Sequence, residues 1–374
     1  MNLALEQAKR IVIKIGSSLI ADIDRASVRE SWLLELCSDI AKLRARGCEV
    51  VVVSSGAVAL GRPMLALGHA ALELPEKQAA AACGQILLMQ AWQQALAPHA
   101  LHAAQVLLTL DDSENRKRYL NARATFDTLL ARGLVPIVNE NDTVTTAEIR
   151  FGDNDRLAAR VAAMISADVC ILFSDIDGLY TKNPKLHPDA AHIAHVDAIT
   201  PQIEAMGTGP ASSTSHGGMT TKLMAAKIAV AAGCHLVITQ GDKEAPITAL
   251  ESGAKATWFS AGDSPLSARK HWIAGALHTP GTVTVDDGAK RALVAGSSLL
   301  PAGVISCTGE FDRGDTVLIK SRDGAVLAKG IIAYDAEETL RILGSKSDGI
   351  AAILGYKIRD TLIHRDDMVM IEHG

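Results

Sequence analysis

The sequence has few aromatic residues and no large excess of charge of either sign. Only 3% of its 374 residues are Phe, Trp or Tyr, so we expect no extensive surface that stacks bases or grips a partner through aromatic side chains. The formal net charge of -5 gives no general attraction to nucleic acid or to anionic lipid. Apolar residues make up 48% and charged residues 21%, which is typical of a globular protein with a large core. The length suits roughly two or three domains.

Closely spaced cysteines are lacking as well. The six cysteines are Cys37, Cys48, Cys83, Cys170, Cys234 and Cys307. None of them forms a CxxC pair, so the usual redox and zinc motifs are excluded, and we predict no metal site made by the protein alone. Most lie in apolar segments and are expected to be small buried residues in a reducing environment. Because the N-terminus shows no secretory signal, we predict a cytoplasmic protein.

One long stretch, residues 78–110, contains no charged residue but does not predict a membrane span. It contains six Gln, two His and Pro98, which the hydrocarbon core of a bilayer tolerates poorly. We expect a core helix followed by a strand.

From residue 11 to about residue 240, segments typical of strands and helices alternate. The strand-like segments are short and apolar, which indicates strands buried on both faces of a sheet. They are residues 11–15, 50–53, 134–138, 169–173 and 236–239. The alternation predicts an α/β domain, an open and mostly parallel sheet sandwiched by helices.

A helix is expected between the first two of these strands. Ser27 and Glu30 form a capping-box signature at its start, and Gly47 ends it. The residues expected on its buried face are Leu33, Leu36, Ile40 and Leu43.

The pattern changes after about residue 276, where short β segments are separated by turn signals. These segments are 281–285, 316–320, 325–333 and 368–371. We therefore predict a first domain at residues 1–262, a linker region at 263–277 and a small β-rich domain at 278–374.

Lys14 lies just before the end of the first strand and is followed by Gly16-Ser17-Ser18. Ligands of open α/β sheets bind at the carboxyl ends of the strands, and a lysine buried in an apolar strand needs an anionic partner. Lys14 is therefore a candidate phosphate ligand, the alternative being an edge-strand lysine that reaches solvent. Residues 54–57 follow the second strand and either offer helix amides to an anion or form an ordinary tight connection.

Two clusters of Asn and Asp, residues 139–142 and 152–155, lie between a strand and a helix. They indicate a pocket for a polar ligand, although such residues are also the commonest turn and cap residues. Residues 174–180 follow another strand and form either a turn that binds ribose hydroxyls or a metal-bound water, or a plain loop. Residues 217–222 open a helix with two Gly, two Thr and a Lys, which suits a phosphate. They do not match the P-loop pattern.

Taken together, these turns predict a site for phosphoryl transfer, which needs positive charge on the migrating group. Lys14 and Lys222 would flank this site. A carboxylate between them would hold their ammonium groups in place, and Asp155 at a helix start is the candidate. No activated Ser, Cys or His nucleophile is then required.

The order and spacing of the motifs resemble the amino-acid kinase family over nearly the whole chain, and residues after 276 resemble a PUA domain. The matching segments are 13–18, 54–57, 118–123, 139–142, 152–155, 177–181, 217–222 and 296–301. Within the family, the chain is most similar to members that phosphorylate the γ-carboxylate of L-glutamate in proline synthesis. Those members join the two domains in this order.

The resemblance implies a role for each motif residue. Lys14 and Lys222 would stabilise the transferring phosphoryl group, and Asp155 would organise them. The residues implied in binding glutamate are Ser55, Asn139, Asp142, Asp153 and Asn154. Those implied in binding ATP are Lys14, Ser174, Asp175, His216, Gly217, Gly218, Met219, Thr220, Thr221 and Lys222. ATP would arrive with Mg²⁺, held mostly by phosphates and water.

The chain departs from the family at one motif. Ser215-His216 stand where the family usually has Gly-Thr, so the imidazole of His216 would either contact the nucleotide or point to solvent. The resemblance also implies inhibition by proline through residues 143–151 and a homo-oligomer, either a dimer or a tetramer.

Two rival hypotheses remain. The chain would be another amino-acid kinase, acting on acetylglutamate, carbamate or UMP, although residues 139–142 and the C-terminal domain argue against this. Alternatively, it would bind or modify RNA through the PUA-like domain. Residues 278–374 carry 11 Lys and Arg against 14 Asp and Glu, a net charge of about -3, so the basic footprint of an RNA-binding domain is not predicted.

Overall fold

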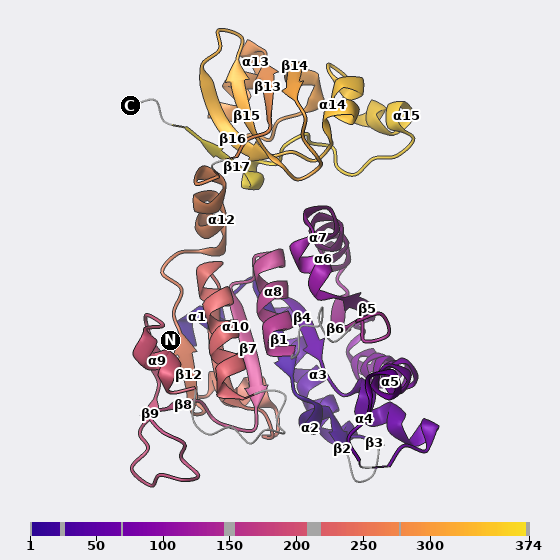
Figure 1. Ribbon diagram of the computed structural model, residues 1–374, viewed down its shortest axis with the longest axis vertical. Helices are drawn as coiled ribbons and strands as arrows, with labels where there is room; N and C mark the ends of the chain where they lie inside the picture. The colour runs from indigo at the N-terminus through magenta and orange to yellow at the C-terminus, as the bar shows by residue number, and fades with distance from the viewer. Residues whose placement is uncertain are drawn as a thin grey trace. The chain divides into compact units, whose positions relative to one another are not determined.

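The computed structural model divides the chain into two compact units, Met1–Pro265 and Leu266–Gly374 (Figure 1). The structure describes residues 2–22, 27–68, 70–145, 154–207, 218–276 and 278–371. Within these ranges, no helix combines the length and the apolar character that crossing a membrane requires.

The first unit is built on a sheet with eight strands among the described residues. They are β1 (Arg10–Ile15), β4 (Glu49–Ser54), β5 (Ala103–Leu108), β6 (Val135–Glu140), β7 (Val169–Ser174), β10 (His195–Val196), β11 (His235–Gln240) and β12 (Ala256–Phe259). Their order is β10-β12-β11-β7-β1-β4-β6-β5, and β11 and β12 form the antiparallel pair. The predicted mostly parallel α/β sheet is therefore confirmed. Since β1 lies between β4 and β7, the alternative of an edge-strand Lys14 is wrong.

Helices cover both faces of this sheet. One face packs against α3 (Glu30–Ala45), α4 (Ala57–Gly61), α5 (Leu74–Leu96) and α11 (Pro246–Glu251). The other packs against α7 (Arg116–Ala131), α8 (Asn154–Ile165) and α10 (Met219–Ala231). Figure 1 shows α8 and α10 side by side across the strands.

Strand β1 shows how the side chains are divided between the two faces. Ile11, Ile13 and Ile15 belong to the core under α3 and α5, whereas Val12 belongs to the core under α8 and α10. Side chains alternate along a strand, so Lys14 is on the same face as Val12. The sequence pattern of β1 thus directs this lysine toward α8 and α10.

Helix α3 buries the predicted apolar face, but its N-terminus differs from the prediction. Leu33, Leu36, Ile40 and Leu43 are all buried, as predicted. The predicted capping box is wrong, because the N-cap is Arg29 and Ser27 belongs to the short strand β3 (Ser27–Val28). Before α3 the chain instead forms two short paired strands, β2 (Ala21–Asp22) and β3.

The uncharged stretch at residues 78–110 forms most of α5 and then β5, so the predicted core helix and strand are confirmed. Helix α5 lies unusually close to α4. A Cβ atom at Gly84 would lie 1.8 Å from the Ala57 carbonyl oxygen, and one at Gly61 would lie 1.9 Å from the Ala80 carbonyl oxygen. Glycine at both positions therefore lets the two helix backbones touch.

The second unit is β-rich, as predicted. Its sheet has the order β14-β13-β15-β16-β17. The elements are β13 (Gly281–Val285), β14 (Val304–Gly309), β15 (Thr316–Ser321), β16 (Val326–Ile331) and β17 (Met368–Met370), with helices α13 (Asp287–Val294), α14 (Ala336–Ile342) and α15 (Ile350–Leu354). Helix α12 (Pro265–Ala274) occupies most of the span 263–277 that the sequence analysis treats as a linker. Arg269 of α12 forms an ion pair with Asp367, so this span is folded.

The remaining elements are short. They are α1 (Asn2–Gln7), α2 (Ser17–Ile20), α6 (Leu110–Glu114), α9 (Pro201–Ala205), the hairpin strands β8 (Leu179–Tyr180) and β9 (His192–Ile193), and the 3-10 turns Arg62–Leu65, Ala97–His99, Pro301–Gly303, Ser347–Gly349 and Arg365–Asp367. All six cysteines are free.

Candidate active site

A buried carboxylate holds two lysines at the carboxyl end of the central strand. Lys14 Nζ lies 2.6 Å from Asp155 Oδ1, and Lys222 Nζ lies 3.0 Å from Asp155 Oδ2. The side chains are 11%, 6% and 1% exposed for Lys14, Lys222 and Asp155. The structure thus brings together three predicted residues from β1, α8 and α10. The net charge of this triad is positive.

The ionisation of Asp155 is maintained by its two partners. Burial raises the pKa of its carboxyl group, but the charges and hydrogen bonds of Lys14 and Lys222 outweigh burial and lower it below its ordinary value. Asp155 also lies in the first turn of α8, where the helix dipole favours a negative charge. The carboxylate therefore stays charged at neutral pH and holds both ammonium groups in place.

The first turn of α10 lies beside this triad. Its N-cap residue is Gly218, which makes no side-chain cap hydrogen bond, and Met219 begins the helix. Thr221 Oγ1 donates to the Gly218 carbonyl at 2.8 Å and lies 3.4 Å from Asp155 Oδ2, while Thr220 Oγ1 donates to the Gly207 carbonyl at 2.8 Å. A helix start next to a lysine is suited to binding a phosphate.

Polar residues at the start of α8 and at the ends of β4 and β6 form one network. Asn154, the first residue of α8, donates from Nδ2 to Ser55 Oγ at 2.7 Å and to Asn139 Oδ1 at 3.1 Å. Ser55 follows β4, and Asn139 lies near the end of β6. Three of the residues predicted to bind the amino acid are thus in direct contact.

Asp142 lies in the turn after β6. Burial raises the pKa of its carboxyl group to about 6. A carboxylate that is costly to ionise favours a cationic partner.

Ser174 and Asp175 lie at the end of β7, on the other side of β1. Ser174 is buried, and its hydroxyl donates to Asp175 Oδ1 at 3.0 Å. Gln240 of β11 pairs with Ser174, so the polar ends of two neighbouring strands meet here. In the ranges that the structure covers, no group of three or more His, Cys, Asp or Glu could hold a metal ion.

Some predicted residues lie outside the described part of the chain. They are Asp153, His216, Gly217 and residues 146–151 of the segment predicted to respond to proline. The two alternatives for His216 therefore both stay open.

Sequence reasoning missed one buried polar residue that joins the network. Gln85 of α5 accepts a hydrogen bond at Oε1 from Asn139 Nδ2, at 3.0 Å. The only signal in the sequence is an amide in a helix that is otherwise apolar and uncharged in this region. Nothing in the spacing of α5 relates it to residue 139.

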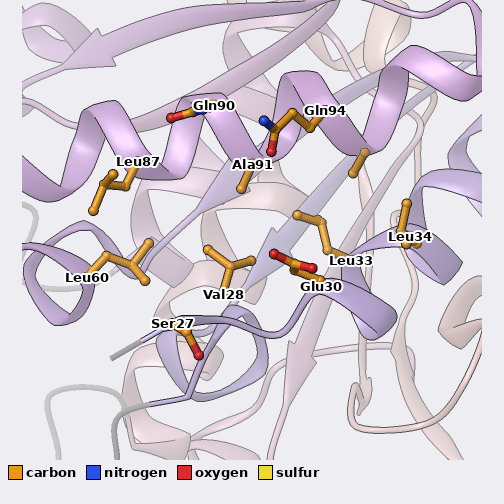
Figure 2. A pocket seen from close by; sticks show the side chains of 11 residues that line it. Ser27, Val28, Glu30, Leu33, Leu34, Leu60, Leu87, Gln90, Ala91 and Gln94 are labelled. Atoms are coloured by element: carbon orange, nitrogen blue, oxygen red, sulfur yellow. The ribbon is translucent and has the colours of Figure 1, made fainter. Parts of the chain in front are cut away.

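A separate hollow of about 380 Å³ lies between α3 and α5 (Figure 2). Leu33 and Leu34 of α3 face Leu87 and Ala91 of α5 across it, and Leu60 of α4 lies at one end. Its lining, all within the described ranges, includes none of the predicted site residues. It is not part of the candidate active site.

Comparison with known proteins gives two matching family models. Residues 9–240 match the amino acid kinase family, and residues 281–354 match the PUA domain. A protein named glutamate 5-kinase from Paramagnetospirillum magneticum is 57% identical over 366 residues, covering 98% of this chain and 99% of its own length. One named glutamate 5-kinase 1 from Rhizobium meliloti is 56% identical over 367 residues, covering 98% of this chain and 93% of its own. Among solved structures, UMP kinase from Ureaplasma parvum has a TM-score of 0.47 and 17% identity, covering 68% of this chain and 99% of that chain.

Proposed function

Because this chain belongs to the amino acid kinase family and carries a PUA domain, we propose that it phosphorylates the γ-carboxylate of L-glutamate with ATP, the first step of proline biosynthesis. The product is glutamyl 5-phosphate. Relatives that match almost the full length of the chain and bear the name glutamate 5-kinase support this substrate.

The observation that carries the proposal is the triad of Lys14, Asp155 and Lys222. Phosphoryl transfer requires little covalent participation by the protein, so catalysis depends on position and on positive charge around the migrating group. Each ammonium group is positively charged and carries three N–H donors, which suits it to contact both Asp155 and phosphate oxygens. One lysine would stabilise the transferred group and the other the leaving phosphate.

The proposed reaction does not require a catalytic base. An oxygen of the γ-carboxylate, already ionised at neutral pH, forms a bond to the γ-phosphorus of ATP. The bond from that phosphorus to the bridging oxygen breaks, and ADP leaves with the electron pair. Ser55, Asn139, Asp142, Asp153 and Asn154 would hold the amino acid, with an ionised Asp142 suited to its ammonium group.

The nucleotide would bind on the other side of β1. Ser174, Asp175, His216, Gly217, Gly218, Met219, Thr220 and Thr221 are the proposed ligands besides the two lysines. Mg²⁺ arriving with ATP would supply positive charge to the phosphates. The side-chain oxygens of Ser174 and Asp175, which are hydrogen-bonded at the end of β7, suit the water shell of such an ion.

A hydroxamate assay tests the substrate. The protein is incubated with ATP, Mg²⁺ and hydroxylamine, which traps an acyl phosphate, and each candidate acid is added in turn. L-Glutamate should give the hydroxamate and acetylglutamate should not, and UMP should not stimulate ADP release. Faster turnover with acetylglutamate, carbamate or UMP would assign the chain to another member of the family.

The same proposal extends to control and assembly. We expect proline to raise the apparent KM for glutamate, which glutamate titrations with added proline test. We also expect the protein to self-associate as a dimer or a tetramer, which sedimentation at several concentrations tests, and to be located in the cytoplasm. A monomer at all concentrations, or kinetics unchanged by proline, would remove the corresponding part and leave the kinase activity in place.

A further inference from the structure

Helix α5 carries a buried amide that the reaction described above does not use. Gln85 is 9% exposed. Its Oε1 accepts from Asn139 Nδ2, but its Nε2 has no hydrogen-bond partner among the residues that the structure describes. Burying an amide donor without a partner costs stability. Packing alone therefore does not account for a glutamine at this position.

The hydrogen bonds around Asn139 have a defined direction. The backbone N–H of Glu140 donates to Asn139 Oδ1 at 2.9 Å, and a backbone N–H can only donate. This contact identifies Oδ1 as the oxygen of the amide. The Nδ2 group of Asn139 must then be the donor toward Gln85 Oε1.

The donor and acceptor roles at Asn139 also determine the role of Ser55. Because Asn139 Oδ1 is an acceptor, Asn154 must present Nδ2 to it, and the same Nδ2 donates to Ser55 Oγ. The Ser55 oxygen is thus an acceptor within the network, and its own hydrogen remains available for another partner. A hydroxyl that must donate outward is suited to a carboxylate of the bound amino acid.

We propose that Gln85 is a positioning residue for the amino-acid subsite. Its Oε1 holds the Asn139 amide in one orientation, and through Asn154 this keeps the Ser55 hydroxyl pointing at the substrate. The inference rests on the proposed function, because it concerns the affinity for glutamate.

The surroundings of α5 support a positioning role. Trp92, on the same helix, donates from Nε1 to Ser54 Oγ at 3.2 Å, at the end of β4. Gly84, next to Gln85, lies in backbone contact with α4, which follows Ser55 in the chain. Helix α5 is thus fixed to the segments that carry both Ser55 and Asn139.

Gln85→Met tests the proposal, because methionine has a similar length and shape but no amide. We expect the KM for glutamate to rise about tenfold while the KM for ATP changes less than twofold. The rise of the melting temperature on adding glutamate should shrink in parallel, which gives a readout that does not depend on turnover. Gln85→Glu keeps an oxygen that accepts from Asn139 Nδ2, so its KM for glutamate should stay within about threefold of the wild type.

The matched control is Gln93→Met, on the same helix. Gln93 also accepts one hydrogen bond, from the backbone N–H of Ala103, and its Nε2 lies beside His102, so among the described residues it has no hydrogen bond to a predicted site residue. A double-mutant cycle adds the decisive comparison: in an Asn139→Ala background, Gln85→Met should have no further effect on the KM for glutamate.

Several outcomes would overturn the inference. These are equal effects of Gln85→Met and Gln93→Met on the KM for glutamate, additive effects in the cycle, or a loss in Gln85→Glu as large as in Gln85→Met. If the wild type itself shows no glutamate-dependent turnover, the proposed function fails instead, so the two failures are distinguishable.

Discussion

Each unit of the molecule holds a buried aspartate between two cations, but the cations differ in kind. In the first unit, Asp155 lies between Lys14 and Lys222, at 2.6 and 3.0 Å. In the second unit, Asp367 lies between Arg269 and Arg359, at 2.8 and 3.2 Å. The two carboxylates are almost equally buried, with 1% and 5% of the side chain exposed.

The difference in cation shows what each cluster can do. A guanidinium is a rigid planar fork that suits a fixed carboxylate, and Arg269 uses it to join α12 to the 3-10 turn before β17. An ammonium group is a compact charge on a flexible stem, so it can contact Asp155 and a moving phosphate at once. The lysine cluster also lies at the carboxyl end of a central parallel strand, where ligands of such sheets bind. We therefore expect the first cluster to serve catalysis and the second to serve stability.

Asp155→Asn should have the largest effect of any single change to the two clusters. It removes the carboxylate charge that lies between the buried ammonium groups of Lys14 and Lys222, and breaking a buried ion pair in this way costs about 3–5 kcal/mol. Turnover should fall at the same time, on the order of 10²-fold or more, because the lysines lose their fixed positions. Urea unfolding and steady-state kinetics measure the two losses. A variant with normal stability and activity would contradict a central role for this carboxylate.

Lys222→Ala should cost on the order of 10²-fold in kcat, since it removes one oriented cation from the transition state. The matched control is Lys227→Ala on the same helix, where the ammonium group pairs with Glu204 on the exposed surface. An exposed pair of this kind contributes little, so Lys227→Ala should change kcat less than twofold. Equal effects of the two substitutions on kcat would break the link between the triad and catalysis.

Asp367→Asn should destabilise the second unit without changing the chemistry. Two guanidinium groups would lose their shared anion, and since Arg359 is partly exposed we expect a loss of about 1–3 kcal/mol. Scanning calorimetry of the full chain should show an unfolding transition at a lower temperature, while kcat with glutamate stays within twofold of the wild type. A fall in kcat as large as that of Lys222→Ala would show that both clusters serve the reaction.

The sequence predicts the lysine cluster better than the arginine cluster, and the reason is local. Lys14 interrupts an apolar strand next to a Gly-Ser-Ser turn, and Lys222 follows a Gly pair at a helix start, so both stand out in short windows. Arg269 and Asp367 are 98 residues apart, in a segment expected to be a linker and in a turn. No local pattern relates them, so α12 was not anticipated.

The contrast between local sequence signals and contacts made only in the folded chain also explains the other differences between the predictions and the structure. The parallel strands of the first unit are buried on both faces and show as apolar segments, whereas β14 is an edge strand with exposed residues and leaves no such segment. Ser27 and Glu30 have the spacing of a capping box, but tertiary pairing of β2 with β3 takes Ser27 into a strand. Gln85 was missed because only the folded chain brings α5 next to the end of β6.

The pKa of a third aspartate, Asp142, is shifted in the direction opposite to that of Asp155. The lysines lower the pKa of Asp155, so that group stays ionised at neutral pH, whereas burial raises the pKa of Asp142 to about 6. Above pH 6 the Asp142 carboxylate can attract the ammonium group of glutamate, and as the pH falls through 6 it becomes neutral and loses that attraction.

The KM for glutamate should therefore rise about tenfold between pH 7 and pH 5, since roughly nine-tenths of Asp142 is protonated one unit below its pKa. The KM for ATP should change little over this range, because Asp155 remains charged and the lysines keep their anchor. In Asp142→Asn, the KM for glutamate should be high and nearly independent of pH. A wild-type profile that is flat from pH 5 to 7 would mean that the substrate ammonium group is held by another carboxylate.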